Sequence, residues 1–205
     1  MNKSLIIFAW LFWSGISLAG DYSIKADEVR LLPPYCKSLT PKHFTPAAQK
    51  LLAGARKPPS GFSNIHHFCH GLKYLIRARR TFGDEGRKDY RLKQAIGEFD
   101  YVIGAKRPGS KMYQAYVRVN RAKAYEMKDD LGASLRDLAD AIRMAPKFPY
   151  SYARMSDLYL KMGNHEDARK VLHQGLKSAP KSKMLRRRWQ KLEKLQSQSL
   201  SGDSK

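Results

Sequence analysis

Three histidines and a cysteine gather within five positions of the segment "NIHHFCHGLKYLIRA" at residues 64–78, as His66, His67, Cys69 and His70. Imidazole and thiolate groups are side chains that bind zinc in proteins. On a helix His66 and His70 lie one turn apart on the same face, and Cys69 is three residues from His66. With a cysteine from elsewhere in the chain they would form a Cys/His ligand set, although the spacing matches no established zinc signature.

The competing interpretation pairs Cys69 with Cys36, the other of the two cysteines in the sequence. In an oxidising exported compartment two cysteines most simply form one disulfide. This bond would close a loop of 33 residues (69 minus 36), which in the chain-entropy model stabilises a fold by roughly 3–4 kcal/mol. We therefore expect a disulfide-stapled helix with His67 packed or hydrogen-bonded inside the fold. Zinc binding by His66, Cys69 and His70 is kept as the alternative.

The compartment follows from the N-terminus, where a short cationic start precedes an apolar run from Leu5 to Trp13 and small residues at Ser17 and Ala19. This order is typical of a secretory signal peptide. We expect cleavage after Ala19, which assigns residues 1–19 to the signal and predicts a periplasmic or secreted protein. The alternative is an anchor that is not cleaved, although the run is shorter than the roughly 20 residues of a membrane span.

The chain is strongly basic, with 39 Lys+Arg, 18 Asp+Glu and a net charge of +21. The predicted signal carries only Lys3, so the remaining chain keeps a charge of +20 (21 minus 1). A field of this sign favours polyanions such as acidic polysaccharide or an anionic lipid surface. Nucleic acid is a weaker expectation, because the protein is predicted to be exported and has no interleaved aromatic platform.

Two segments of the chain, 115–148 and 149–182, align without a gap at a period of 34 residues (149 minus 115). A period of this length is the signature of helical repeats. The aligned pairs are Ala122 and Ser156, Tyr125 and Tyr159, Ser134 and Ala168, Leu138 and Leu172, Ala141 and Gly175, and Pro146 and Pro180.

This pattern resembles the tetratricopeptide repeat, whose members carry small, aromatic, apolar and proline residues at these positions of a helical hairpin. The first copy departs from the family at Arg118, where the second copy has the expected aromatic, Tyr152. The resemblance implies an all-α solenoid of paired helices. The motifs "LPPYC" and "HHFCHGL" ahead of the repeats also resemble a set of exported bacterial repeat proteins.

Two repeats need further helices to cover their ends. We expect residues 64–107 to form a degenerate first repeat, in which "RRTFGDEGRKDY" at 79–90 is a longer loop than the family allows. Residues 183–197 are expected to form a capping helix and residues 198–205 a disordered tail. Residues 20–63 form a proline-rich N-terminal segment outside the resemblance.

No catalytic set appears in the sequence. There is no phosphate-binding glycine-rich motif, no G-x-S-x-G and no H-E-x-x-H. The histidine cluster has no obvious carboxylate partner in the sequence around it. We therefore expect a protein that is not an enzyme and needs no cofactor.

The resemblance to the repeat family also implies a concave groove, lined by the first helix of each repeat, that binds a protein partner. The matching positions are Tyr116, Val119, Lys123, Glu126, Met127, Tyr150, Ala153, Asp157, Leu160 and Lys161. They lack the Lys/Asn arrangement with which similar proteins clamp a terminal carboxylate. The alternative for Tyr116 and Tyr150 is that they only pack between repeats.

A second surface is predicted from a basic cluster in the capping helix, made of Lys183, Arg186, Arg187, Arg188 and Lys191. Arginine forms paired hydrogen bonds with carboxylate and phosphate groups. The sequence therefore favours an exported adaptor that binds protein in its groove. The alternatives are a polyanion-binding protein that uses this basic face and a metal-binding regulator that uses the histidine cluster.

Overall fold

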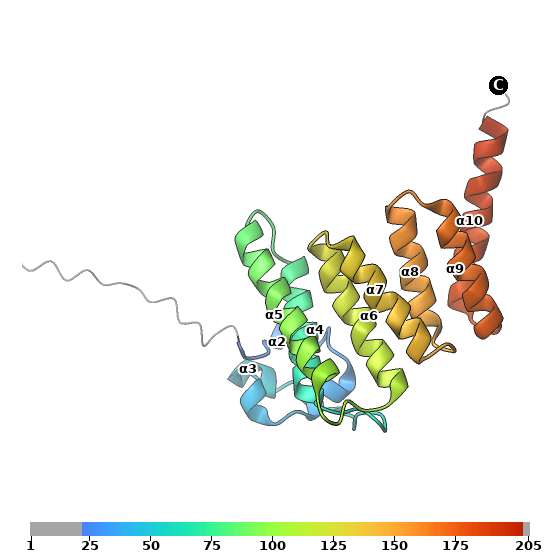
Figure 1. The fold of residues 1–205 in the computed structure, drawn as a ribbon. Helices are drawn as coiled ribbons and strands as arrows, with labels where there is room; N and C mark the ends of the chain where they lie inside the picture. The colour runs from blue at the N-terminus through green and yellow to red at the C-terminus, as the bar shows by residue number, and fades with distance from the viewer. Residues whose placement is uncertain (1–21, 203–205) are drawn as a thin grey trace, which may run out of the picture.

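The computed structural model describes residues 22–202, with side chains described for residues 22–194. Residues 1–19, the predicted signal peptide, lie outside the described residues. Within the described part all helices and turns are joined by loops, and the one β contact is an isolated bridge between Ile24 and Phe44. The predicted all-α architecture of stacked helical hairpins is confirmed (Figure 1).

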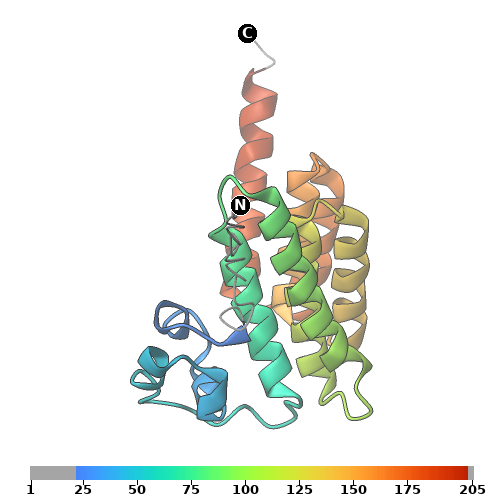
Figure 2. The ribbon, with the colours of Figure 1, turned by 90° about the vertical axis from the view of Figure 1, so that its left-hand side faces the viewer.

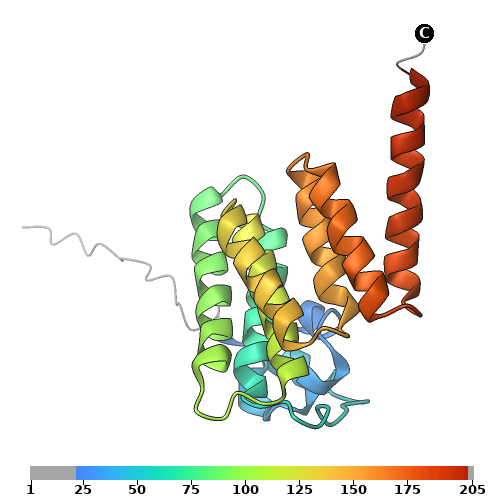
Figure 3. The same ribbon diagram turned by 45° about the vertical axis from the view of Figure 1, so that its right-hand side comes forward.

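The body of the molecule is a row of antiparallel helix pairs followed by a last helix (Figures 1 and 3). α4 pairs with α5, α6 with α7 and α8 with α9, while α10 packs on α8 and α9. The helices are α4 (Ile65–Arg79), α5 (Glu85–Gly104), α6 (Lys111–Met127), α7 (Leu131–Met144), α8 (Pro149–Lys161), α9 (His165–Ser178) and α10 (Lys183–Gly202).

Side chains at the helix starts explain why these helices begin where they do. The Asp84 carboxylate accepts a hydrogen bond from the Arg87 backbone N–H, and Asn164 does the same for Asp167. Ser110 and Asp130 cap α6 and α7 in the same way. Each cap satisfies an N–H that has no partner inside its own helix.

Small residues let the paired helices approach closely, as the repeat pattern predicts. A Cβ atom added to Gly71 would lie 2.5 Å from the Phe99 ring, and one added to Gly175 would lie 2.8 Å from Tyr152. The Ser134 hydroxyl donates a 2.9 Å hydrogen bond to the Ala122 carbonyl across α6 and α7. The hairpins are therefore held by close backbone packing at the expected positions.

The first hairpin differs from the sequence prediction in where its extra residues lie. α5 begins at Glu85 and has 20 residues, so most of 79–90 is helix rather than a long loop. Gly83, with a φ of +72°, makes the turn, and the Asp84 cap then starts the helix at once. The insertion therefore lengthens the second helix.

The C-terminal helix also extends further than expected. α10 runs through Gly202, whereas the capping helix was predicted to end at residue 197. Neither proline nor glycine interrupts the sequence between Lys183 and the serine before Gly202, so nothing in the chain forces an earlier stop. Residues 198–202, expected to be disordered, are helical, and 203–205 lie outside the described residues.

The N-terminal segment, residues 22–63, folds as short turns against α4. Its elements are α2 (Ala26–Val29), η1 (Pro34–Ser38), η2 (Pro41–His43) and α3 (Pro46–Gln49). Val29, Phe44 and Ala48 form a small core with Cys69 and with Ile76 of α4. Figure 2 shows this segment on the side of α4 that faces away from α5.

No helix among residues 22–202 combines the length and the apolar character that a membrane span requires.

Candidate functional site

The N-terminal segment is held on α4 by a disulfide. The Cys36 and Cys69 sulfur atoms are 2.05 Å apart, and both residues are buried. The bond joins η1 to the first half of α4 and so fixes the segment at its middle. It also occupies the Cys69 sulfur, which removes that atom from the alternative zinc ligand set.

A buried ion pair provides a second anchor. The Arg77 side chain donates a 2.8 Å hydrogen bond to Glu28 Oε2 and a 2.7 Å bond to the Ser23 carbonyl. The side chains of Arg77 and Glu28 are 5% and 3% exposed. Burial of two opposite charges is tolerated because the guanidinium and the carboxylate satisfy each other.

A chain of hydrogen bonds connects α4 with the N-terminal segment through two histidines. The Lys73 ammonium lies 2.6 Å from the Tyr22 carbonyl and 3.2 Å from His70 Nδ1. His70 Nε2 in turn lies 3.0 Å from His43 Nδ1. His70 and Lys73 are buried, so this chain runs inside the protein and ends at His43.

The direction of these hydrogen bonds follows from the chemistry of lysine. An ammonium group can only donate, so His70 Nδ1 accepts and His70 carries its proton on Nε2. That proton is donated to His43 Nδ1, which leaves the proton of His43 on Nε2. Burial is the main cause that lowers the pKa of His70 to about 3, and the Lys73 charge adds to it. The chain therefore holds both rings neutral in defined tautomers.

Of the other two histidines of the cluster, His67 contacts α5, and His66 lies between His67 and His43. His67 Nδ1 is 2.7 Å from Glu98 Oε2, and its ring stacks on Tyr101 at 3.7 Å between centroids. The His66 ring lies 4.1 Å from His67. Glu98 is the carboxylate partner that sequence reasoning did not find, because it comes from the next helix and follows no motif.

The metal alternative finds no ligand set in this geometry. His66 and His70 do share α4, but His70 uses both ring nitrogens within the hydrogen-bond chain. No group of three or more histidine, cysteine, aspartate or glutamate side chains in residues 22–202 is arranged to hold a metal ion. The cluster instead positions the N-terminal segment on α4.

The N-terminal segment also covers one end of the predicted groove. Tyr35 forms a side-chain hydrogen bond with Tyr116, and burial raises the pKa of both phenols. The Phe62 ring stacks on Tyr113 with 4.2 Å between centroids and lies 6.4 Å from the Tyr116 ring. Tyr116, predicted to contact a partner, is therefore half-buried under residues of its own chain.

Two other predicted groove residues are in the core. Val119 and Ala153 are 0% exposed. Val119 packs with Leu138 and Leu158, and Ala153 packs with Leu185 of α10. Their assignment to the groove is wrong, because the neighbouring helices cover these faces of α6 and α8.

The remaining predicted groove residues lie at the surface or partly beneath it. Lys123 Nζ lies 5.0 Å from the centre of the Tyr150 ring. Glu126 forms an ion pair with Arg154 and lies 3.9 Å from Lys161 Nζ. The other members, Met127, Asp157 and Leu160, are partly buried.

The predicted basic face is divided by the structure. Lys183, Arg186, Arg187 and Lys191 are exposed. Arg188, in contrast, donates two hydrogen bonds of 2.9 Å to the Asp157 carboxylate of α8, and this contact raises the pKa of Arg188. The guanidinium of Arg188 therefore joins α10 to the predicted groove and contributes little net charge to the basic face.

Comparison with known proteins finds a family model that is similar to part of the chain. The tetratricopeptide repeat family model matches residues 127–193. No curated protein matches the chain. The first tetratricopeptide-repeat domain of Spaghetti (RPAP3) bound to an HSP90 peptide is similar in structure, with 16% identity, a TM-score of 0.49, and coverage of 67% of this chain and 98% of that chain.

The hetero-tetramer Cut9–Hcn1 of the APC/C complex is a second similar structure. It has 14% identity and a TM-score of 0.46, and the match covers 64% of this chain but only 23% of that chain. The residues that match the tetratricopeptide repeat model, 127–193, lie within a longer row of helical hairpins that begins at α4.

Proposed function

We propose that this protein is an exported, non-catalytic adaptor that binds a segment of a partner protein on its concave face. The observation that carries this proposal is a pair of adjoining hollows that meet at Arg79. Five of the residues predicted for the groove line these hollows: Tyr116, Lys123, Glu126, Met127 and Lys161.

The smaller hollow, of about 180 Å³, lies where the N-terminal segment meets α4 and α6. Its apolar part includes Leu31 and Pro33 from that segment and Leu72 and Ile76 from α4. Leu31 is 54% exposed although it is a large apolar side chain. The N-terminal segment therefore acts as one wall of the site rather than only as a cover.

The larger hollow, of about 490 Å³, lies at the α4–α5 turn and extends to the end of α8. Phe82 of this turn is 87% exposed. Charges of both signs line it, including Lys88, Glu126 and Lys161. Exposed apolar side chains within a polar rim are usual in protein interfaces. The partner would be an amphipathic segment whose apolar side chains cover Leu31 and Phe82.

Export is part of the proposal, and its support is the Cys36–Cys69 disulfide. Disulfides persist in oxidising compartments and are rare where thiols are kept reduced. The predicted signal peptide at residues 1–19 leads to the same compartment.

The test is selection of binding peptides from a display library with the oxidised protein, followed by affinity measurements on single-residue variants. Leu31→Ser and Phe82→Ser should each weaken binding about tenfold or more, because a fully covered Leu or Phe contributes about 1.5–3 kcal/mol. The control is Tyr90→Ser, another exposed aromatic, which lies on α5 outside both hollows.

Equal affinity of the Leu31, Phe82 and Tyr90 variants would refute the concave site. Charge reversal at Arg186 and Arg187 separates the adaptor from the polyanion-binding alternative. The adaptor keeps its peptide after that change, whereas a protein that works through the basic face loses its ligand.

A further inference from the structure

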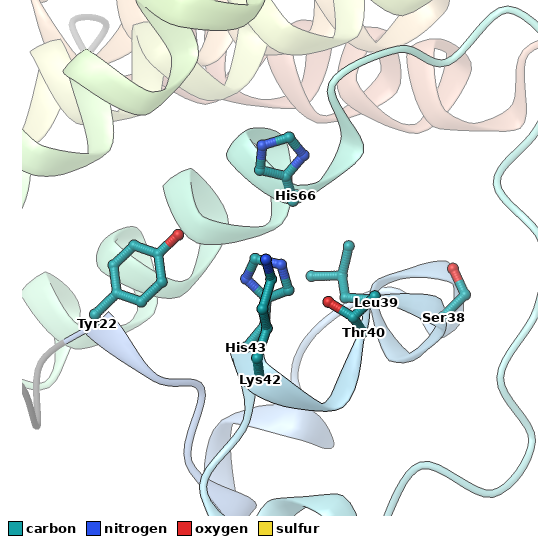
Figure 4. A pocket seen from close by; sticks show the side chains of 7 residues that line it. All are labelled: Tyr22, Ser38, Leu39, Thr40, Lys42, His43 and His66. Carbon is teal, nitrogen blue, oxygen red and sulfur yellow. The ribbon is translucent and has the colours of Figure 1, made fainter.

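A third hollow lies between the N-terminal segment and the start of α4, away from the concave face. Its volume is about 590 Å³, and it is lined by Tyr22, Ser38, Leu39, Thr40, Lys42, His43 and His66. Figure 4 shows the Tyr22, His43 and His66 rings gathered around it. The described functions of the groove and the basic face do not use this hollow.

Among the described residues, the lining of this hollow offers hydrogen-bond donors and a cation but no carboxylate. Thr40 and Tyr22 bring hydroxyl groups, and Lys42 brings an exposed ammonium. The Ser38 hydroxyl already donates to the Tyr35 carbonyl at 2.7 Å and can only accept from a ligand. The sequence contains no aspartate or glutamate between residues 29 and 83. All of these lining residues except Tyr22 therefore come from a stretch without acidic side chains.

His43 is the buried polar side chain among the residues that line the hollow. It is 8% exposed, and its Nδ1 accepts the proton of His70 Nε2. Its own proton therefore lies on Nε2, which has no hydrogen-bond partner among the described residues. The tautomer is fixed from inside the protein by Lys73, so His43 is held as a donor.

His66 adds a second open imidazole. Neither of its ring nitrogens has a hydrogen-bond partner within residues 22–202, and its ring lies 5.9 Å from that of His43. It projects from the first turn of α4, whereas His43 comes from η2. The N-terminal segment and α4, which the Cys36–Cys69 bond joins, thus each place an imidazole on one hollow.

We propose that this hollow is a binding site for a small oxyanion, a carboxylate or phosphate group, held by Lys42, His66 and the Nε2 proton of His43. An anionic oxygen satisfies the donors that the site presents, and none of the described lining residues carries a carboxylate that would repel it. A metal cation is the wrong partner, because His43 presents a proton and Lys42 a positive charge.

Binding should strengthen at mildly acidic pH. The groups around His43 are Tyr22 and Lys42 from the N-terminal segment and His66, His67, His70 and Lys73 from α4, with Glu98 of α5 bound to His67. Burial lowers the pKa of His43 and His66, and the nearby Lys42 charge adds to this. A bound carboxylate favours the protonated form of His66, so carboxylate binding takes up a proton and tightens as the pH falls from 7.5 to 5.5.

The experiment uses the oxidised protein with ¹⁵N-labelled histidine, and follows the ring nitrogens by NMR at pH 5.5 and 7.5. The spectra first identify the tautomers of His43 and His70, both expected with the proton on Nε2. Inorganic phosphate and glucuronate are then titrated separately, with neutral glucose as a control for sugar binding. Shifts of the His43 and His66 signals give the dissociation constants.

Charge reversal in Lys42→Glu, at an exposed side chain that leaves folding intact, should weaken binding about tenfold or more. His66→Gln tests the second imidazole in the same way. His165→Gln, at the exposed start of α9, is the matched control and should leave binding unchanged.

Binding of phosphate alone, glucuronate alone or both supports the site and tells which oxyanion it prefers. Glucose binding with equal affinity would overturn the proposal, as would the absence of saturable shifts with either anion. Equal loss in Lys42→Glu and His165→Gln would also overturn it.

Discussion

The buried ion pair Glu28–Arg77 stands beside an exposed pair, Asp27–Arg80, which allows a controlled prediction. The carboxylates are neighbours in α2, and their partners are three residues apart at the end of α4. The side chains of the first pair are 3% and 5% exposed, and those of the second pair are 62% and 45% exposed. Glu28→Gln and Asp27→Asn each remove one charge without changing shape.

The expected losses differ because of burial. Glu28→Gln leaves the Arg77 guanidinium buried without its counter-charge, which costs about 3–5 kcal/mol. In the wild-type protein the Lys25 backbone N–H donates to Glu28 Oε2 at 2.8 Å. The glutamine amide of the variant must point its N–H groups either at this donor or at the Arg77 guanidinium, and neither can accept a hydrogen bond. Asp27→Asn should cost less than about 1 kcal/mol, because water screens the exposed pair.

The assay is urea unfolding of the oxidised variants at pH 7, followed by circular dichroism. Hydrogen exchange of the α2 amides is measured in parallel, because the N-terminal segment could open locally while the hairpins stay folded. The double variant Glu28→Leu with Arg77→Met should lose less than Glu28→Gln does, since no charge remains uncompensated. The reasoning is refuted if Glu28→Gln costs no more than Asp27→Asn in both measurements.

Three further predictions concern the same fold. Replacing both cysteines by serine should lower the free energy of unfolding by about 4 kcal/mol for the 33-residue separation, measured by urea unfolding; an unchanged value contradicts it. Gly71→Ala should lower the free energy of unfolding by about 1–3 kcal/mol, because its Cβ would meet Phe99 at 2.5 Å. Gly97→Ala, with open space around it, should instead raise it by up to about 1 kcal/mol. Equal effects of the two substitutions would refute this prediction. As the pH falls from 6.5 toward 3, the free energy of unfolding should fall by about 1.4 kcal/mol per pH unit through His70. Over this range unfolded His70 binds a proton that the folded ring, with a pKa of about 3, does not. The slope should be smaller in His70→Gln, and an unchanged slope would assign it to other groups.

The repeat region was the most predictable part of the molecule. The period of 34 places Ala122, Ser134 and Leu138 at fixed positions, and all three are at most 2% exposed. Small residues and caps act within one hairpin, so their pattern is visible along the sequence. The start of α5 could not be predicted from the sequence. It depends on one N-cap residue, Asp84, which stands in a polar stretch with the composition of a loop.

The N-terminal segment was predictable only through its cysteine. Its other anchors join residues that are far apart in sequence, 49 residues for Glu28 and Arg77 and 27 for His43 and His70. No periodic pattern connects such pairs, and a lone His43 in a proline-rich stretch carries no signal of its own. The density of histidines in α4 was visible in the sequence, but the side chains that they contact, His43 and Glu98, come from other elements.

Asp157 and Arg188 show why the two predicted surfaces could not be separated from sequence. The repeat register assigns Asp157 to the groove, and the run of arginines assigns Arg188 to a basic face. Both assignments consider one helix by itself. The contacts of each side chain depend instead on how α10 packs on α8. Because the two side chains pair across those helices, a partner that reached Asp157 would have to displace Arg188. The open part of the concave face therefore lies toward Arg79 and the N-terminal segment, and not toward the C-terminal helix.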